Sequence, residues 1–210
     1  MNKNILLFFT LSLFIIYKIV NFSAQFYYSQ NKSFKIPTGK IMKKIVVFGM
    51  PGAGKSTWSL KLSKKTNIPL YHIDKFFFTE NWKKRPTEDF ITLKQEIMKN
   101  DSWILDGNGF QTLELRYKEA DTVILFAYPR WICYWRVVKR LFDKDPAIKD
   151  RAPNTKEVVR WELIKYMWNV NKRAIVLSNM LQKKYPHVTF YTVHSDKEAQ
   201  KLLELLGSLT

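Results

Sequence analysis

The sequence predicts an α/β fold in which helices cover a mostly parallel, five-stranded sheet. From Lys44 onward, short apolar runs typical of strands alternate with segments of helical periodicity, and this alternation is the pattern of such a sheet. A glycine-rich turn separates the first strand from the first helix. The 210 residues are 46% hydrophobic and 15% aromatic, with only seven glycines and eight prolines, which favours a packed core over a disordered chain.

The first half of this pattern begins with an expected strand at residues 45–48. The glycine-rich turn leads into a helix over about 55–65, and a strand follows near 70–73. Pro86 followed by Thr-Glu-Asp is typical of a helix start and predicts a helix through about residue 99. A third strand is expected at 103–105, ending at Asp-Gly-Asn.

The second half continues the alternation. A fourth strand is expected at residues 122–127, and Pro129 opens a helix that runs to about residue 142. Residues 143–155 are charged, contain two prolines and lack periodicity, so they are predicted to form a mobile loop. A long helix over 156–184, a strand over 188–193 and a closing helix over 197–206 complete one domain spanning residues 42–210.

The N-terminal residues differ from this domain. Residues 5–17 form an apolar run, and with residues 18–22 it would make a hydrophobic helix marginally long enough for a membrane anchor. The alternative is that translation begins at Met42, so that residues 1–41 have no functional role. A cleaved signal peptide is disfavoured because no small-x-small cleavage site follows the run: cleavage after Ala24 would place the bulky Phe22 at position −3. Residues 23–41 are predicted to be a linker, and an anchor would leave the domain in the cytoplasm.

The net charge of +17 is concentrated near the N-terminus. The first 73 residues hold eleven lysines and no acidic residue, while the remainder has 24 basic and 18 acidic residues. That smaller surplus suits a polyphosphate ligand as well as a nucleic acid, so nucleic acid is a possible partner but not the favoured one. Cys133 is the only cysteine, which excludes an intramolecular disulfide and a cysteine zinc site and fits a reducing compartment.

Residues 49–56, GMPGAGKS, match the phosphate-binding pattern G-x-x-x-x-G-K-S/T in full. The motif lies after an apolar strand and before a helix, which is the context that it requires. Its backbone N–H groups would bind the phosphate oxygens of a nucleotide, Lys55 would reach the β- and γ-phosphates, and the Ser56 hydroxyl would bind Mg²⁺. The predicted nucleotide-binding residues are Gly49, Gly52, Ala53, Gly54, Lys55, Ser56 and Thr57.

Further motifs follow in order along the chain. They read GMPGAGKST, YHIDKFFF, NWKKRP, WILDGN, LELRYKEADT and PRWICYWRVVKR. In this order they resemble the P-loop kinase group that includes adenylate kinase and shikimate kinase, and most closely the bacterial topology modulation proteins. The resemblance implies a P-loop NTPase fold with a five-stranded parallel sheet, ATP and Mg²⁺ as ligands, and a lid at about 143–155 that closes over the phosphates.

The resemblance also implies roles for individual residues. Asp106 matches a strand-end carboxylate that holds Mg²⁺ through water, and its alternative role is that of a turn residue. Asp74 matches a carboxylate that binds the acceptor or accepts its proton, although an ion pair or a helix cap would also explain it. Arg116 is a further candidate contact for the acceptor.

Arg136 and Arg140 match lid arginines of the adenylate kinase group. Their four-residue separation places both on one helical face, where two guanidinium groups can converge on one polyphosphate. The alternative is a solvated basic face. One position departs from the family pattern, because Ala127 stands where relatives often carry an Asp, and this change predicts slow turnover or nucleotide binding without chemistry.

Aromatic residues recur at helical spacing in the second half of the chain. They are predicted to pack between two helices rather than to stack on bases, and they comprise residues 131, 134, 135, 161, 166 and 168. Cys133 is expected to be a buried small hydrophobe, and His72 to line the acceptor site.

Two functions remain open from the sequence. The first is a kinase that transfers the γ-phosphate of Mg-ATP to a small acceptor, a nucleotide or another metabolite. The second is a nucleotide-dependent DNA-binding protein that modulates topology and uses ATP as a switch. The identity of the acceptor and the choice between ATP and GTP are not visible in the sequence.

Overall fold

The computed structural model describes residue 34 and residues 42–77, 86–140 and 161–208. The predicted N-terminal helix and the predicted 143–155 lid lie outside these ranges. The chain divides into two units, Met1–Lys35 and Ile36–Thr210, and every helix and strand below belongs to the second. Among the described residues, no helix combines the length and the apolar character that crossing a membrane requires.

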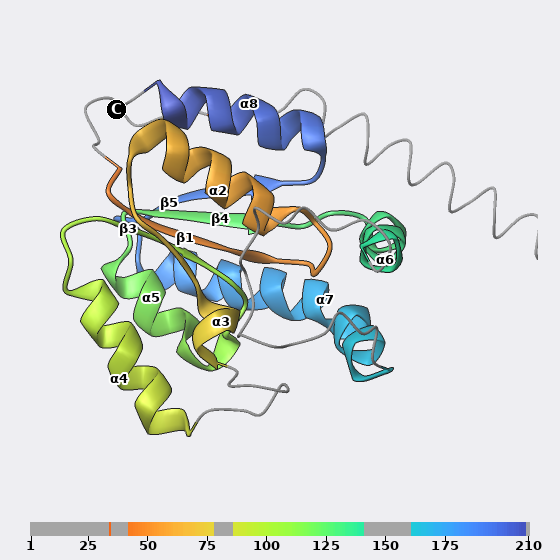
Figure 1. Ribbon diagram of the computed structural model, residues 1–210, viewed down its shortest axis with the longest axis horizontal. Helices are drawn as coiled ribbons and strands as arrows, with labels where there is room; N and C mark the ends of the chain where they lie inside the picture. The colour runs from red at the N-terminus through yellow and green to blue at the C-terminus, as the bar shows by residue number, and fades with distance from the viewer. Residues whose placement is uncertain (1–33, 35–41, 78–85, 141–160, 209–210) are drawn as a thin grey trace, which may run out of the picture. The chain divides into compact units, whose positions relative to one another are not determined.

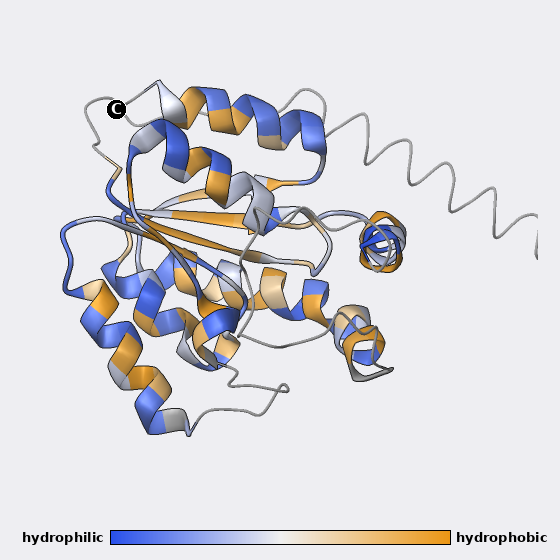
Figure 2. Ribbon diagram, viewed as in Figure 1, coloured by the Kyte–Doolittle hydropathy of each residue, from blue (hydrophilic) through white to orange (hydrophobic). Residues whose placement is uncertain are grey.

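Five parallel strands form the sheet, as the sequence predicts. They are β1 (Lys44–Gly49), β2 (Leu70–His72), β3 (Trp103–Asp106), β4 (Thr122–Phe126) and β5 (Thr189–Val193), in the spatial order β2-β3-β1-β4-β5. β1 is central, and its neighbours β3 and β4 are buried along their whole length. Their nearly continuous apolar sequences follow from burial on both faces of the sheet. Figure 2 shows these strands in hydrophobic colours between helices of mixed character.

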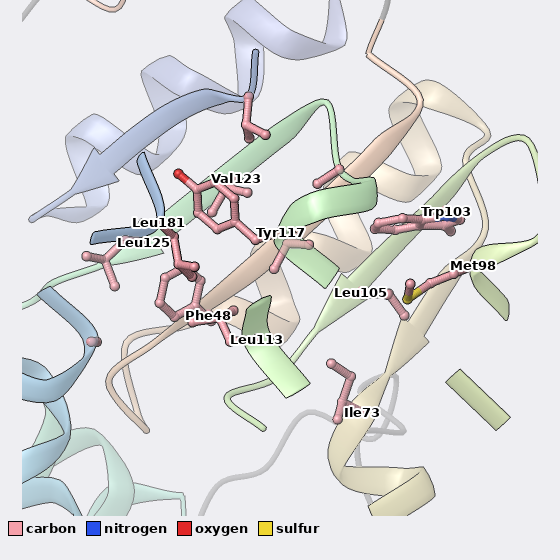
Figure 3. Close-up of a cluster of buried hydrophobic side chains, with 14 of the residues drawn as sticks. Phe48, Ile73, Met98, Trp103, Leu105, Leu113, Tyr117, Val123, Leu125 and Leu181 are labelled. Carbon is pink, nitrogen blue, oxygen red and sulfur yellow. The ribbon is translucent and has the colours of Figure 1, made fainter. Parts of the chain in front are cut away.

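Helices cover both faces of the sheet (Figure 1). α2 (Lys55–Thr66) and α8 (Asp196–Gly207) lie on one face, and α4 (Thr87–Met98), α5 (Leu113–Glu119) and α7 (Trp161–Lys184) lie on the other. The core between the second group and the sheet contains Phe48, Trp103 and Tyr117, all fully buried (Figure 3).

The short helices were not predicted. α3 (Ile73–Phe77) begins at the residue where the second strand was expected to end, and η2 (Phe110–Thr112) precedes α5. Each has at most seven residues, which is too few for hydrophobic periodicity to identify a helix. α6 (Arg130–Lys139) begins directly after Pro129, as expected.

The prediction that the aromatic residues of α6 and α7 are buried was wrong for three tryptophans and for Tyr166, which is 37% exposed, and the Trp161 side chain lies outside the described residues. The two helices do contact each other, and the Tyr134 hydroxyl donates to the Ile164 carbonyl at 3.3 Å. However, Trp131, Trp135 and Trp168 are 59%, 66% and 61% exposed. Helical spacing shows that residues share a face but not which way that face points. Cys133 is fully buried, as predicted.

Candidate functional site: a phosphate loop facing buried charges

The phosphate loop is packed tightly against the neighbouring strand and helix. The Met50 N–H donates to the Phe126 carbonyl at 3.0 Å. Gly49 has φ +130°, and a Cβ on it would lie 2.3 Å from the same carbonyl oxygen. A Cβ on Gly52 would lie 2.5 Å from the Cys133 carbonyl oxygen. Only glycine fits these two positions, because any side chain would collide with backbone atoms.

Lys55 begins α2 directly after the loop. Its Nζ donates to the Met50 carbonyl at 2.9 Å, so the ammonium group lies over the loop's own backbone. Burial lowers the pKa of Lys55, while the charges of Asp106 and Asp74 act in the opposite direction. Ser56 and Thr57 lie half-buried in the same first helical turn. The predicted nucleotide-binding residues therefore form one contiguous structure at the carboxyl end of β1.

Asp106 ends β3 and is held by a histidine from the adjacent strand. His72 and Asp106 are register partners in the β2–β3 pairing, and His72 Nδ1 lies 2.9 Å from Asp106 Oδ2. The Asp106 side chain is only 3% exposed. Its other oxygen, Oδ1, is buried without a hydrogen-bond partner in the described part of the chain. Such an orphaned carboxylate oxygen fits a hard cation or a cation-bound water.

Mg²⁺ typically keeps several waters and takes one or two protein oxygens together with substrate phosphates. The described residues hold no cluster of three or more His, Cys, Asp or Glu side chains that could bind a metal by themselves. The donors available near the loop are the Ser56 hydroxyl and Asp106, which is the sparse set that a phosphate-bound Mg²⁺ requires. These residues therefore fit the ion.

Asp74 lies in the first turn of α3 and is exposed. Its Oδ1 is 3.6 Å from the position that a Cβ on Gly107 would take, so it faces the end of β3. Its negative charge raises the pKa of Lys55, Lys94 and Arg116, each against the larger lowering effect of burial. Asp74 thus lies among three basic side chains and next to the Asp106 strand end.

Arg116 is fully buried in α5 and holds the loop that follows β3. Its guanidinium donates to the carbonyls of Gly107, Asn108 and Gly109 at 3.0, 2.6 and 3.1 Å. Burial lowers its pKa to about 10, so it stays charged at neutral pH. With its donors directed at the backbone, Arg116 supports the loop, and the expected contact with an acceptor is not what its geometry provides.

Asn108 joins this loop to the phosphate loop, a role that the sequence did not indicate. Its Oδ1 accepts a hydrogen bond from the Gly49 N–H at 2.9 Å. The contact spans 59 residues of sequence, so only the folded arrangement of β1 beside β3 brings the two together. It couples the position of the phosphate loop to the loop that Arg116 supports.

Lys94 is a second buried basic residue, and the sequence analysis missed it. It is 1% exposed, donates to the Thr112 hydroxyl, and lies 3.8 Å from the centre of the Phe90 ring. Burial, together with the charge of Arg116, lowers its pKa to about 6. Its place in the helical series Phe90, Lys94, Ile97 was the available signal, because a lysine there occupies an otherwise apolar face.

The predicted lid arginines lie beside the phosphate loop. A Cβ on Gly54 would be 4.0 Å from Arg136 Nη1, and Arg136 Nη2 pairs with Asp196 Oδ2 at 2.5 Å. The charge of Arg140 lowers the pKa of Lys55, which places that guanidinium near the same site. Ala127, at the departure from the family pattern, is buried and donates its N–H to the Val193 carbonyl at 2.8 Å.

Comparison with solved structures supports the fold. The chain is similar to shikimate kinase from Acinetobacter baumannii in complex with shikimate, at 18% identity and a TM-score of 0.51, covering 80% of this chain and 94% of that one. Shikimate kinase from Bacteroides thetaiotaomicron matches at 15% identity and a TM-score of 0.47, covering 80% and 98%. No protein-family model and no curated protein matches the chain. The chain therefore has the five-stranded P-loop kinase fold.

Proposed function

We propose that this protein is a phosphotransferase that moves the γ-phosphate of Mg-ATP to a small hydroxylated acceptor. The observation that supports this most directly is the placement of Lys55, Asp106 and Asp74. Lys55 follows β1, Asp106 is the last residue of β3, and Asp74 follows β2; the carboxyl ends of these parallel strands share one edge of the sheet, and both carboxylates act on the pKa of Lys55. Phosphoryl transfer requires chiefly the positioning of reactants and compensation of charge, which this arrangement provides.

Each residue has a role in this proposal. The loop N–H groups and Lys55 bind the polyphosphate, and Ser56 and Asp106 would hold Mg²⁺, which would supply positive charge to the phosphates. Asp74 accepts the proton of the acceptor hydroxyl. The hydroxyl oxygen then bonds to the γ-phosphorus while the bond between the γ-phosphorus and ADP breaks. Arg136 and Arg140 compensate charge on the transferring group.

Two features bear on the rate and the identity of the acceptor. Ala127 supplies no carboxylate near the metal, so the proposal includes slow turnover. Asp74 is exposed at this edge of the sheet, so the acceptor is a small molecule that brings a hydroxyl group to it, such as a nucleotide or a hydroxy acid. The resemblance to topology modulation proteins is part of the same proposal, because their motifs are those of a small kinase.

The test is ADP production by the purified full chain with Mg-ATP and a panel of nucleoside monophosphates and small hydroxy acids. One acceptor should raise turnover, and Lys55→Met should abolish that increase. Lys61→Met is the matched control, since Lys61 is an exposed lysine of the same helix, and it should behave as the unmodified protein. If nucleotide binds and no acceptor raises turnover, the kinase proposal fails for that panel.

The second candidate function is nucleotide-dependent binding of DNA. The net charge of +17 favours it. It predicts DNA binding that weakens steeply with salt and that differs between ATP and ADP. Binding that is insensitive to the nucleotide would reflect the basic N-terminal residues alone and would exclude the switch.

A further inference from the structure

The surface of α6 exposes a stripe of large apolar side chains. Trp131, Trp135 and Val138 are spaced i, i+4 and i+7 and are 59%, 66% and 44% exposed. This spacing puts them on one face of the helix, and the buried residues Cys133 and Val137 lie on the other side. On soluble proteins, contiguous exposed apolar patches mark sites of interaction with other proteins, membranes or ligands.

α7 continues the same character. Trp168, Val176 and Met180 are 61%, 62% and 54% exposed. The Arg130 guanidinium lies 5.1 Å from the centre of the Trp168 ring, so this tryptophan stands beside the start of α6. Figure 1 shows α6 and the N-terminal part of α7 at the same end of the sheet. Val176 and Met180 lie about two and three turns further along α7, away from that end. We therefore define the α6–α7 surface as the exposed side chains of Trp131, Trp135, Val138 and Trp168.

The charges on these two helices define the partner. Residues 130–140 carry four basic and no acidic residues, and α7 carries five basic residues and one acidic residue. Arg136 and Arg140 lie at the phosphate loop and Lys184 pairs with Glu114, so the remaining six basic residues and one acidic residue give these helices a net charge of +5. A second copy of the chain would bring this charge against itself, which disfavours a symmetric dimer. The partner must therefore be negatively charged and must also accept indole and aliphatic side chains.

We propose that the α6–α7 surface docks on an anionic lipid bilayer. Indole rings and aliphatic chains would enter the boundary between headgroups and acyl chains, while lysines and arginines contact lipid phosphates. A single-stranded nucleic acid would use the tryptophans for stacking but would leave the exposed Val138 without apolar contact. The apolar run at residues 5–17 of the same chain is a separate sequence feature that suits a bilayer.

The experiment measures tryptophan fluorescence of the full chain mixed with vesicles whose acyl chains carry bromine, a contact quencher. The test variant is Trp131→Ser/Trp135→Ser/Trp168→Ser, and Lys197→Ser/Lys201→Ser on α8 is the control. Phosphatidylglycerol vesicles should quench the tryptophan fluorescence of the unmodified protein roughly threefold more than that of the tryptophan variant. Phosphatidylcholine vesicles should quench the fluorescence of the unmodified protein far less than phosphatidylglycerol vesicles do. The α8 control should match the unmodified protein.

This difference isolates the surface from the N-terminal residues, because any insertion of residues 5–17 is the same in both proteins. Circular dichroism should show an unchanged fold, since the three indoles are exposed. Equal quenching of the unmodified protein and the tryptophan variant overturns the proposal, as does equal quenching by neutral vesicles. Quenching by a short oligonucleotide but not by vesicles also overturns it and assigns the surface to nucleic acid.

Discussion

The phosphate loop consists of nine consecutive residues that act mainly through their backbone, whereas the opposite side of the candidate site is assembled from side chains of several elements. Gly49 and Gly52 approach neighbouring carbonyls too closely for any side chain. On the other side, Lys94 of α4, Arg116 of α5 and Asp74 of α3 meet around the loop after β3. The first side is local in sequence, and the second depends on the sheet order.

This difference teaches how each side fails. A backbone-built loop is sensitive to the addition of an atom, because its neighbours are main-chain groups that cannot move aside. The side built from buried side chains is sensitive to the removal of Arg116, because its donors satisfy carbonyls that would otherwise be buried alone. Lys94 differs, because its burial disfavours the charged form of its own side chain. Asn108 links the two, so a change on either side is expected to reach the other.

The largest effect is expected from Gly49→Ala. The added Cβ would lie 2.3 Å from the Phe126 carbonyl oxygen at φ +130°, so the loop must shift. We expect a loss of about 4 kcal/mol in the free energy of unfolding, measured in urea, together with loss of binding to a fluorescent ATP analogue. Gly54→Ala is the control, because its nearest neighbour is 4.0 Å away and only the backbone strain remains. Equal effects of the two variants would contradict the tight packing of the loop at β4.

The next effect is expected from Arg116→Met. It leaves the carbonyls of Gly107, Asn108 and Gly109 without their buried donor. We expect a loss of about 3 kcal/mol in the free energy of unfolding. Arg116→Lys should not restore it, because an ammonium group cannot reproduce the planar fork of donors. Full stability of the lysine variant would show that the charge alone, and not the guanidinium geometry, supports the loop.

The same contrast explains what the sequence could predict. The phosphate loop and the five strands were predicted because a contiguous motif and apolar runs carry their own signal. The His72–Asp106 contact was not, since it depends on β2 lying beside β3, and strand order is not written in local periodicity. α3 and α5 were too short for a period to emerge. Exposure of Trp131 was missed because spacing defines a face without its direction.

A smaller effect is expected from His72→Asn. Without the imidazole 2.9 Å from Oδ2, Asp106 loses the contact that orients its free oxygen. The gain in ADP affinity on adding Mg²⁺ should fall about tenfold, while ADP affinity without the ion stays the same. Calorimetric titration with and without Mg²⁺ measures both, and His187→Asn, an exposed histidine, is the control. An unchanged response to Mg²⁺ would reduce His72 to a packing role.

The last prediction concerns Lys94 and the pH dependence of stability. Its pKa is about 6 in the folded protein against a usual value of 10.5, so between these values the unfolded chain binds a proton that the folded protein lacks. Stability therefore rises with pH across this window, by at most about 1.4 kcal/mol per pH unit from this residue.

Lys94→Met removes that contribution and keeps the volume of the side chain. The variant should be more stable than the unmodified protein at pH 7. The difference should shrink by pH 9, because the cost of removing the Lys94 proton on folding falls as the pH approaches the pKa of this lysine in the unfolded chain. Urea unfolding at pH 7, 8 and 9 measures this, with Lys99→Met, an exposed lysine just after α4, as the control. Parallel curves for the two proteins would mean that Lys94 stays protonated beside Arg116, so that this side of the site holds two buried positive charges compensated by Asp74.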